Sequence, residues 1–172
     1  VVVIDPRRTR SARAADQHIF IRPGTDALLL ASMLQVIFEE DLVDVGRLGE
    51  FLSGIEAVAE AVAPFSPKRV AGRCGVPAPV IRNLAIEFAE AESAAIHGRM
   101  GIHASAFGTL ASWAVDAMSI VTGNLDRRGG TMFPKAAHSA RKERAGGGGF
   151  QTGRWRSRVR DLPETLGEFP VA

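Results

Sequence analysis

The chain has 172 residues, of which 46% are apolar and 23% charged, with a formal net charge of +2. This composition indicates a folded domain with a real core and excludes an intrinsically disordered chain. A single cysteine, Cys74, excludes a disulfide framework and any four-cysteine zinc or iron–sulfur site within the chain, and no apolar run approaches the roughly 20 residues of a membrane span.

A first strand is predicted at Val1–Ile4, where four β-branched apolar residues stand in a row. Such a run is typical of a parallel strand buried on both faces, and nucleotides bind at the edge where such strands end. Asp5 would lie at this edge, because Pro6 ends the strand. Its carboxylate could accept hydrogen bonds from ribose or from the N–H edge of guanine, and Arg7 could meet phosphate. Asp5 could equally be a turn-forming aspartate.

A second strand is predicted at Gln17–Arg22, followed by a glycine turn and a long helix at Asp26–Glu40. Thr25 is expected to cap this helix, so that the free N–H groups of its first turn face the same edge as Asp5. Asp26 would add a second carboxylate there, or would only complement the helix dipole. The helix is apolar nearly all round and must therefore be covered on several sides.

Shorter elements fill the middle of the chain. Short helices or turns are expected at Thr9–Ala15, Gly46–Gly54, Ile55–Val62 and Ser66–Gly75. A longer helix opens at Pro79 and should lie on the sheet through an apolar stripe formed by Val80, Ile81, Leu84 and Phe88.

Ser93–His97 is expected to return to the sheet as a short apolar strand. The glycines at Gly98–Gly101 would end it in a turn with the backbone freedom that a ligand-facing site needs. A helix from His103 to Gly123 should then point its apolar side chains inward, namely Phe107, Leu110, Trp113 or Ala114, Ala117 or Met118, and Val121.

The last quarter of the chain differs in composition from the rest. From residue 127 onward there are ten basic and four acidic residues, and glycine replaces periodic apolar residues. This pattern predicts a loop region. Ala145–Gly149 is interpreted as a flexible linker and not as a phosphate-binding loop, because no strand precedes it and no helix follows.

Three separated segments resemble one enzyme family, in the family's order: residues 1–44, Ser93–Gly101, and 110–134 with its Thr122-Gly123-Asn124 motif. Together with the residues between them they cover roughly four-fifths of the chain. The family is that of the molybdopterin oxidoreductases, which includes formate dehydrogenases, nitrate reductases and dimethyl sulfoxide reductases. The resemblance implies an α/β fold with a Rossmann-like parallel sheet flanked by helices, followed by an irregular Gly/Arg-rich C-terminal region.

The resemblance also implies a bis(molybdopterin guanine dinucleotide) cofactor that carries molybdenum or tungsten. Asp5 and Asp26 match family positions that contact the guanosine part of one pterin dinucleotide. Guanine offers its ring N–H and its exocyclic amine as adjacent donors, and a carboxylate accepts both. Arg7 matches the arginine of the family's D-P-R motif, and Gly24 matches the turn glycine that lets the dinucleotide approach.

A second set of matches lies at the family's G-x-G turn. Gly101 matches its second glycine, near the pterin or the diphosphate. Arg99 stands there in place of a small residue and His103 in place of a hydroxyl or amide residue, so this turn departs from some relatives. Asn124 is expected to form a structural turn and not a cofactor contact.

The resemblance places catalysis outside this chain. In the family, the residue that binds the metal and the cysteines of a 4Fe–4S cluster lie upstream of the matched segments, and residue 1 is not Met. We therefore expect a catalytically inert section of a larger cytoplasmic oxidoreductase, whose partners are the pterin dinucleotide and the rest of that enzyme. Residues 1–100 would form the Rossmann-like binding section, 101–134 a helix and turn leading into a neighbouring domain, and 135–172 a basic flexible loop region.

Separated from that enzyme, the chain should expose apolar surface around its 26–40 helix and self-associate. Two other functions stay open from the residues alone. One is a stand-alone α/β nucleotide-binding module, and the other is an interaction module built on the basic C-terminal region. Nucleic acid is the less favoured partner of the latter, because few aromatic residues accompany its arginines.

Overall fold

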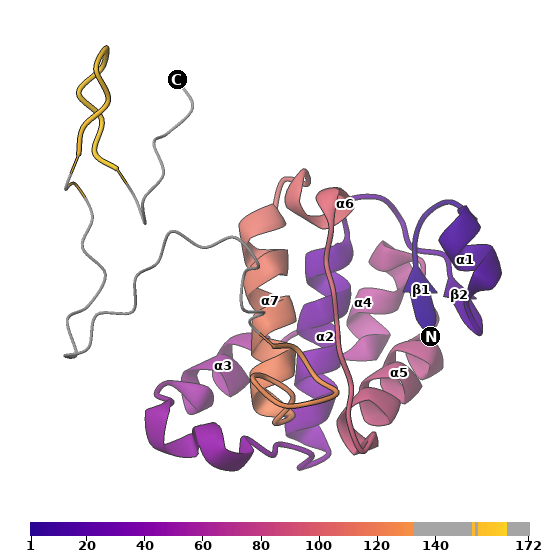
Figure 1. Cartoon of the computed structure of the whole chain (residues 1–172). Helices are drawn as coiled ribbons and strands as arrows, with labels where there is room; N and C mark the ends of the chain where they lie inside the picture. Colours follow the sequence, from indigo (N-terminus) through magenta and orange to yellow (C-terminus); the bar gives the residue numbers. More distant parts are fainter. Residues whose placement is uncertain (133–152, 154, 165–172) are drawn as a thin grey trace. The chain divides into compact units, whose positions relative to one another are not determined.

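The computed structural model describes residues 1–132, 153 and 155–164, and the chain divides into two units, Val1–Phe133 and Pro134–Ala172. The first unit is mixed α/β but mostly helical, with a small parallel sheet of two strands beside a group of helices (Figure 1). The predicted α/β class is confirmed at this level. Within the described residues the sheet is smaller than the sequence predicted.

The two strands are β1 (Val2–Ile4) and β2 (Gln17–Ile19), which pair in parallel with Val3 opposite His18. The predicted short helix between them is α1 (Arg10–Ala14). Because the strands are parallel, both end at the same edge of the sheet.

The second strand is shorter than predicted. It was expected to continue to Arg22, but the strand pairing ends at Ile19. Arg22 N instead donates a hydrogen bond to Cys74 O at 2.8 Å, and the Arg22 guanidinium donates to Arg73 O at 2.9 Å. The chain leaves the sheet at this point because its backbone is used to cap the end of another helix.

Helix α2 (Asp26–Glu39) forms the centre of the core. The helices that pack against it are α3 (Ile55–Val62), α4 (Pro67–Cys74), α5 (Ala78–Glu90) and α7 (Gly108–Val121). Leu34, Val36 and Ile37 are completely buried. The prediction that this helix is covered on several sides is confirmed. The expectation that it would be left partly uncovered in an isolated chain is wrong, because the chain's own helices surround it.

The shorter elements begin close to the residues at which the sequence predicted them. The 3₁₀ helix η1 (Gly46–Phe51) occupies the predicted turn, and Pro67 is the first residue of α4. Helix α5 starts one residue before the predicted Pro79 and buries Ile81 and Ala85. It packs on α2 and α4 and not on the sheet as predicted, because only two short strands are present in the described part.

The helix predicted from His103 to Gly123 begins later, as α7 (Gly108–Val121), and a separate short helix, α6 (Met100–His103), precedes it. The predicted inward face was wrong at two positions, since Phe107 is 62% exposed and Leu110 52%. Of the alternatives Trp113 and Ala114, Ala114 is the buried one.

Small residues decide which face of α7 lies inside. Ala111 and Ala114 are buried with Met118 on the inward face, where small side chains let α7 approach α2 closely. At its start, a Cβ on Gly108 would lie 2.3 Å from the His103 carbonyl oxygen. The reversal of the chain between α6 and α7 therefore needs glycine at this position.

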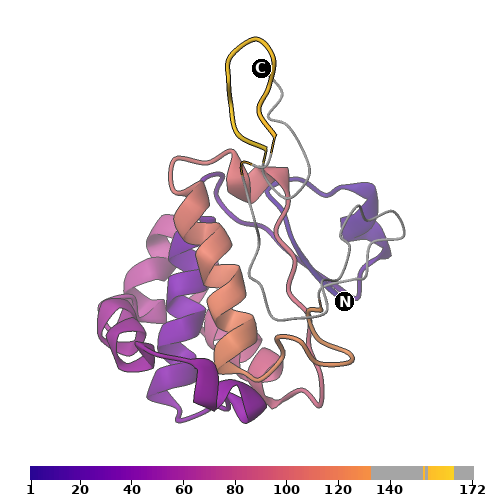
Figure 2. The same ribbon diagram turned by 60° about the vertical axis from the view of Figure 1, so that its left-hand side comes forward.

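Ser93–His97 is not a strand in the structure, and Gly98–Gly101 is not an open turn, since Met100 already begins α6. The segment is extended, but no strand lies beside it among the described residues. Helix α6 is in contact with α7, and Figure 2 shows both helices from a second side.

In the second unit the described part is a short antiparallel hairpin, in which Arg156 pairs with Pro163. The Arg156 guanidinium and the Asp161 carboxylate form an ion pair at 2.8 Å across the hairpin. Residues 155–164 are therefore more ordered than the loop that was predicted, whereas the predicted linker 145–149 lies outside the described residues. Among the helices described, none has the length and apolar character needed to cross a membrane.

Candidate functional site

Asp5 follows β1 directly, at the edge where both strands end. Its Oδ1 accepts a hydrogen bond from Arg7 N at 2.7 Å, which holds the turn made by Pro6. The Asp5 backbone is fixed as well, because its N donates to Ile19 O at 3.1 Å and His18 Nε2 donates to its carbonyl oxygen at 3.0 Å. One carboxylate oxygen therefore serves the turn, and the other accepts no hydrogen bond within the described residues.

Gly24 and Thr25 form the turn that leads into α2. Gly24 has φ +77°, the left-handed conformation that favours glycine, and nothing lies within 4 Å of the place where a Cβ would stand. Thr25 occupies the predicted N-cap position, but its hydroxyl donates to Arg22 O at 2.6 Å instead of accepting from the helix. The prediction of a side-chain cap is therefore wrong, and the Thr25 hydroxyl instead closes the turn from Arg22 to Thr25.

Asp26 is half-buried at the first position of α2. Burial raises the pKa of Asp26 above its ordinary value, a hydrogen bond from its own backbone opposes this, and the negative charge of Asp5 raises the pKa further. Burial is the largest of these influences on the pKa, and the charge of Asp5 is the smallest. We call Asp5, Gly24 and Asp26 the strand-end site.

Arg99 and Gly101 belong to α6. Arg99 precedes the helix as its N-cap residue, has an extended backbone and exposes its side chain. Gly101 lies inside the helix and not in a left-handed turn, so it does not use the conformational freedom predicted for it. Figures 1 and 2 both draw α6 beside the segment that links β2 to α2. The structure thus brings the second predicted set near the strand-end site.

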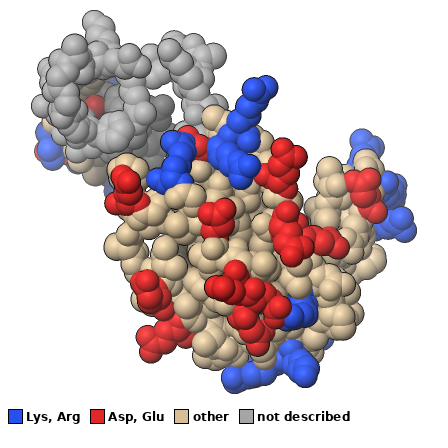
Figure 3. All heavy atoms as spheres, turned by 90° about the horizontal axis from the view of Figure 1, so that it is seen from below, with Lys and Arg blue, Asp and Glu red and all other residues tan. Residues whose placement is uncertain are grey.

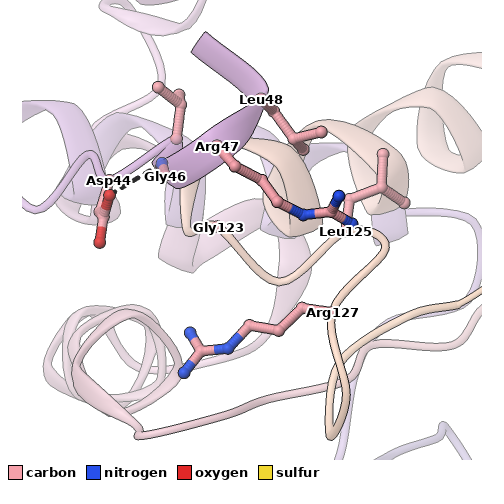
Figure 4. Close-up of a pocket in the computed structure, with 8 residues that line it drawn as sticks. Asp44, Gly46, Arg47, Leu48, Gly123, Leu125 and Arg127 are labelled. Carbon is pink, nitrogen blue, oxygen red and sulfur yellow. Dashed lines mark hydrogen bonds between the residues drawn. The ribbon is translucent and has the colours of Figure 1, made fainter.

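A hollow lies elsewhere in the first unit, between η1 and the turn that follows α7 (Figure 4). It has a volume of about 240 Å³. Asp44, on its wall, accepts a hydrogen bond from Gly46 N at 2.9 Å, and the guanidinium of Arg47 bonds the carboxylate of Asp126. Arg127 also lines the hollow and forms no ion pair among the described residues. Most polar groups here already have internal partners, so this hollow is a weaker candidate than the strand-end site.

The side chains that could bind a metal do not gather in the described part of the chain. No group of three His, Cys, Asp or Glu residues there could hold an ion. Cys74 is completely buried in the core. The residues of the strand-end site can accept hydrogen bonds from a polar ligand, but they offer no nucleophile paired with a base.

Acidic and basic side chains are both present on the face of the molecule that Figure 3 shows. Seen from below, Asp and Glu side chains spread over the middle of one face, with Lys and Arg toward its margins (Figure 3). This face offers no continuous basic surface of the kind that nucleic acid requires.

Asn124 makes a contact with a distant segment that the sequence did not predict. It was expected to form a structural turn, and it does, but its side chain also reaches another segment: Ala94 N donates to Asn124 Oδ1 at 3.0 Å. The only sequence signal for this role was the Thr122-Gly123-Asn124 motif itself.

Comparisons with known proteins agree with this architecture. The family model described as Molybdopterin oxidoreductase matches residues 1–168. Formate dehydrogenase H of Escherichia coli is 35% identical over 127 residues, which cover 74% of this chain and 18% of that protein. The periplasmic nitrate reductase of Desulfovibrio desulfuricans is 33% identical over 142 residues, covering 77% and 19%. The chain therefore spans about a fifth of the length of these relatives.

A solved structure has a similar fold over most of the described residues. Acetylene hydratase from Pelobacter acetylenicus superposes with a TM-score of 0.67 at 32% identity, covering 71% of this chain and 17% of that one. The likeness extends to the arrangement of the helices and is not limited to short motifs.

Proposed function

The chain belongs to the molybdopterin oxidoreductase family, and from this premise we propose that it forms part of the binding site for one molybdopterin guanine dinucleotide. It would hold the guanosine end of that cofactor at the strand-end site. The residues assigned to this role are Asp5, Arg7, Gly24, Asp26, Arg99 and Gly101.

The observation that carries this proposal is the pair of neighbouring carboxylates at the strand-end site. Burial and the charge of Asp5 both disfavour an ionised Asp26, so the arrangement is unfavourable without a ligand. A guanosine offers paired N–H donors on its base and hydroxyl donors on its ribose, which would relieve the repulsion. Sites that are locally unfavourable in this way are often functional.

The surroundings of the two carboxylates fit a dinucleotide. The space beside Gly24 is open, and nothing lies within 4 Å of a Cβ position on Gly101. Arg7 and Arg99 expose side chains that form no ion pair within the described residues, so they could bind the diphosphate. When bound, the cofactor supplies redox chemistry at molybdenum or tungsten, whereas these residues only bind and orient it.

The same proposal includes a larger, Rossmann-like sheet, to which this chain contributes in the full-length enzyme. Within the described residues, Ala95–Gly98 form no hydrogen bonds through their backbone, and half-buried residues alternate with exposed ones from Ala94 to Arg99. That alternation is typical of a strand with one covered face. In the full-length enzyme, this segment would pair with further strands, and residues 1–100 would complete a dinucleotide-binding domain.

The remaining assignments concern the full-length enzyme. We propose that residues 101–134 lead into a neighbouring domain, that 135–172 form a basic region that includes the hairpin at residues 155–164, and that the metal ligand and any 4Fe–4S cluster lie in other parts of that enzyme. The isolated chain would be catalytically inert. Relatives include formate dehydrogenases and nitrate reductases, and the similar solved structure is a hydratase, so the substrate is left open. Location in the cytoplasm stays a prediction.

Guanosine diphosphate tests the proposal because it carries the part of the cofactor assigned to this chain. It should raise the thermal unfolding midpoint, and Asp5→Asn or Asp26→Asn should weaken its binding by about tenfold or more, as expected when a charged acceptor is lost. Titration calorimetry measures the affinity. Asp116→Asn is the matched control, since Asp116 is exposed on α7 and should leave binding unchanged.

Adenosine diphosphate distinguishes recognition of guanine from binding of the diphosphate alone, because adenine lacks the paired donors. Equal affinity for the two nucleotides, or binding that survives both aspartate substitutions, would overturn the proposal.

A further inference from the structure

The turn Thr122–Thr131 closes the C-terminal end of α7, and we call it the clasp. Asn124 stands at its centre and is 1% exposed. Its backbone N donates to Ser119 O at 2.7 Å, and its carbonyl oxygen accepts from Thr131 N at 2.8 Å. Its side-chain amide donates to Thr122 Oγ1 at 3.0 Å. These bonds bind the clasp to the end of α7 and to itself.

Three glycines let the clasp pack this closely. A Cβ on Gly130 would lie 2.1 Å from the Asn124 carbonyl oxygen, and a Cβ on Gly123 would lie 2.8 Å from the Asp44 carbonyl oxygen. On Gly129 a Cβ would lie 2.7 Å from Ser93 Oγ. Gly129 thus lets the clasp pack against Ser93, the residue that precedes another segment of the chain.

That segment is the extended stretch Ala94–Gly98, which leads to Arg99 and α6. Ala94 N donates to Asn124 Oδ1 at 3.0 Å, and this is the only hydrogen bond that the stretch makes within the described residues. At its other end, a Cβ on Gly98 would lie 2.9 Å from Ile102 Cδ1. The stretch is therefore held by Asn124 at its beginning and by side-chain packing farther along.

We propose that Asn124 is a positioning residue for the cofactor site. By fixing the start of the stretch Ala94–Gly98, its side-chain oxygen sets where Arg99 and α6 lie relative to the strand-end site. This inference rests on the proposed function, because α6 matters only if Arg99 and Gly101 bind the dinucleotide. Asn124 itself touches no ligand in this role and acts through the segment that it holds.

The two hydrogen bonds of the Asn124 side chain can be removed separately. Asn124→Ala removes both, whereas Thr122→Val removes the acceptor of the amide group and leaves the bond to Ala94 N in place. Ala94→Pro does the reverse, because proline has no N–H to donate and leaves the clasp intact. Thr122→Val is therefore the control, and Ala94→Pro replaces Asn124→Ala if that variant does not fold.

Trypsin provides a readout that does not depend on activity, because Arg99 is exposed at the end of the stretch. The rate of cleavage after Arg99, measured by mass spectrometry on the folded 172-residue chain, should rise about tenfold or more in Asn124→Ala and in Ala94→Pro. Thr122→Val should change that rate by less than about twofold. Equal rates in all three variants, compared at matched fractions of folded protein, would refute the positioning role.

Binding of guanosine diphosphate separates the two proposals. Its affinity should fall in Asn124→Ala and Ala94→Pro and stay near that of the original chain in Thr122→Val. If the original chain does not bind the nucleotide, the proposed function fails, and the cleavage rates still decide whether Asn124 holds the segment. If the original chain binds the nucleotide, and Asn124→Ala and Ala94→Pro change the cleavage rate but not the affinity, then Asn124 has only a structural role and the inference fails.

Discussion

At the scale of single residues, the site depends on two carboxylates that local sequence places separately and the fold brings together. Asp5 is held by the turn bond to Arg7 N, and Asp26 starts α2. Each residue alone has an ordinary structural explanation. Their mutual repulsion appears only once β1 and α2 are packed in one unit.

The raised pKa of Asp26, which comes mainly from burial and to a smaller extent from the charge of Asp5, predicts a pH dependence of stability. Because the folded-state pKa of Asp26 is raised, its ionised form destabilises the fold above that pKa, and the penalty disappears as pH falls toward the ordinary value of 3.8. Asp26→Asn should therefore increase the free energy of unfolding at pH 7, and its advantage should shrink below pH 3.8. Urea unfolding at the two pH values measures the difference. An advantage that does not change with pH would contradict this account.

At the scale of elements, α2 is the long apolar helix that the sequence predicted, but it also contains a feature that the sequence did not indicate. Its apolar residues are buried as predicted, but two polar atoms are buried with them. Ser32 Oγ and Gln35 Oε1 have no hydrogen-bond partner among the described residues. A buried polar atom without a partner lowers stability.

Two substitutions in α2 should therefore act in opposite directions. Leu34→Ala removes a completely buried side chain and should lower the free energy of unfolding by about 2–5 kcal/mol. Ser32→Ala removes the unpaired hydroxyl at a completely buried position and should raise it by about 1 kcal/mol. Chemical denaturation measures both. A loss of stability in Ser32→Ala would mean that the hydroxyl has a partner in solution.

At the scale of the whole molecule, exposed apolar side chains lie on α6 and α7 and not around α2. We call Met100, Phe107, Leu110 and Trp113 the apolar ridge; each is at least 46% exposed. Large exposed apolar side chains close together on adjoining helices are typical of a surface that another part of a protein covers. The self-association predicted from the sequence should thus use this ridge.

Sedimentation velocity tests that expectation. The chain should form dimers or larger species as its concentration rises, and Leu110→Lys combined with Trp113→Lys should shift it toward the monomer. Phe51→Lys is the control, because Phe51 is equally apolar and 82% exposed but lies on η1, away from the ridge. A monomer at every concentration, or an equal effect of the control, would exclude the ridge as the contact surface.

The sequence by itself determined the features that depend on neighbours in the chain. The turn at Asp5 and Pro6, the glycine turn at Gly24, the start of α4 at Pro67 and the long apolar α2 were all predicted, because proline, glycine and apolar periodicity act over a few residues. The family was likewise recognisable from short motifs, since such motifs preserve local geometry.

Only the tertiary structure decided which surfaces meet. The predicted inward face was wrong at Phe107 and Leu110, because helical periodicity marks apolar residues but not which of them another helix covers. Ser93–His97 has the pattern of a strand, yet a strand exists only where a neighbour supplies hydrogen bonds. The bond from Ala94 to Asn124 joins residues 30 positions apart, and no local rule could pair them.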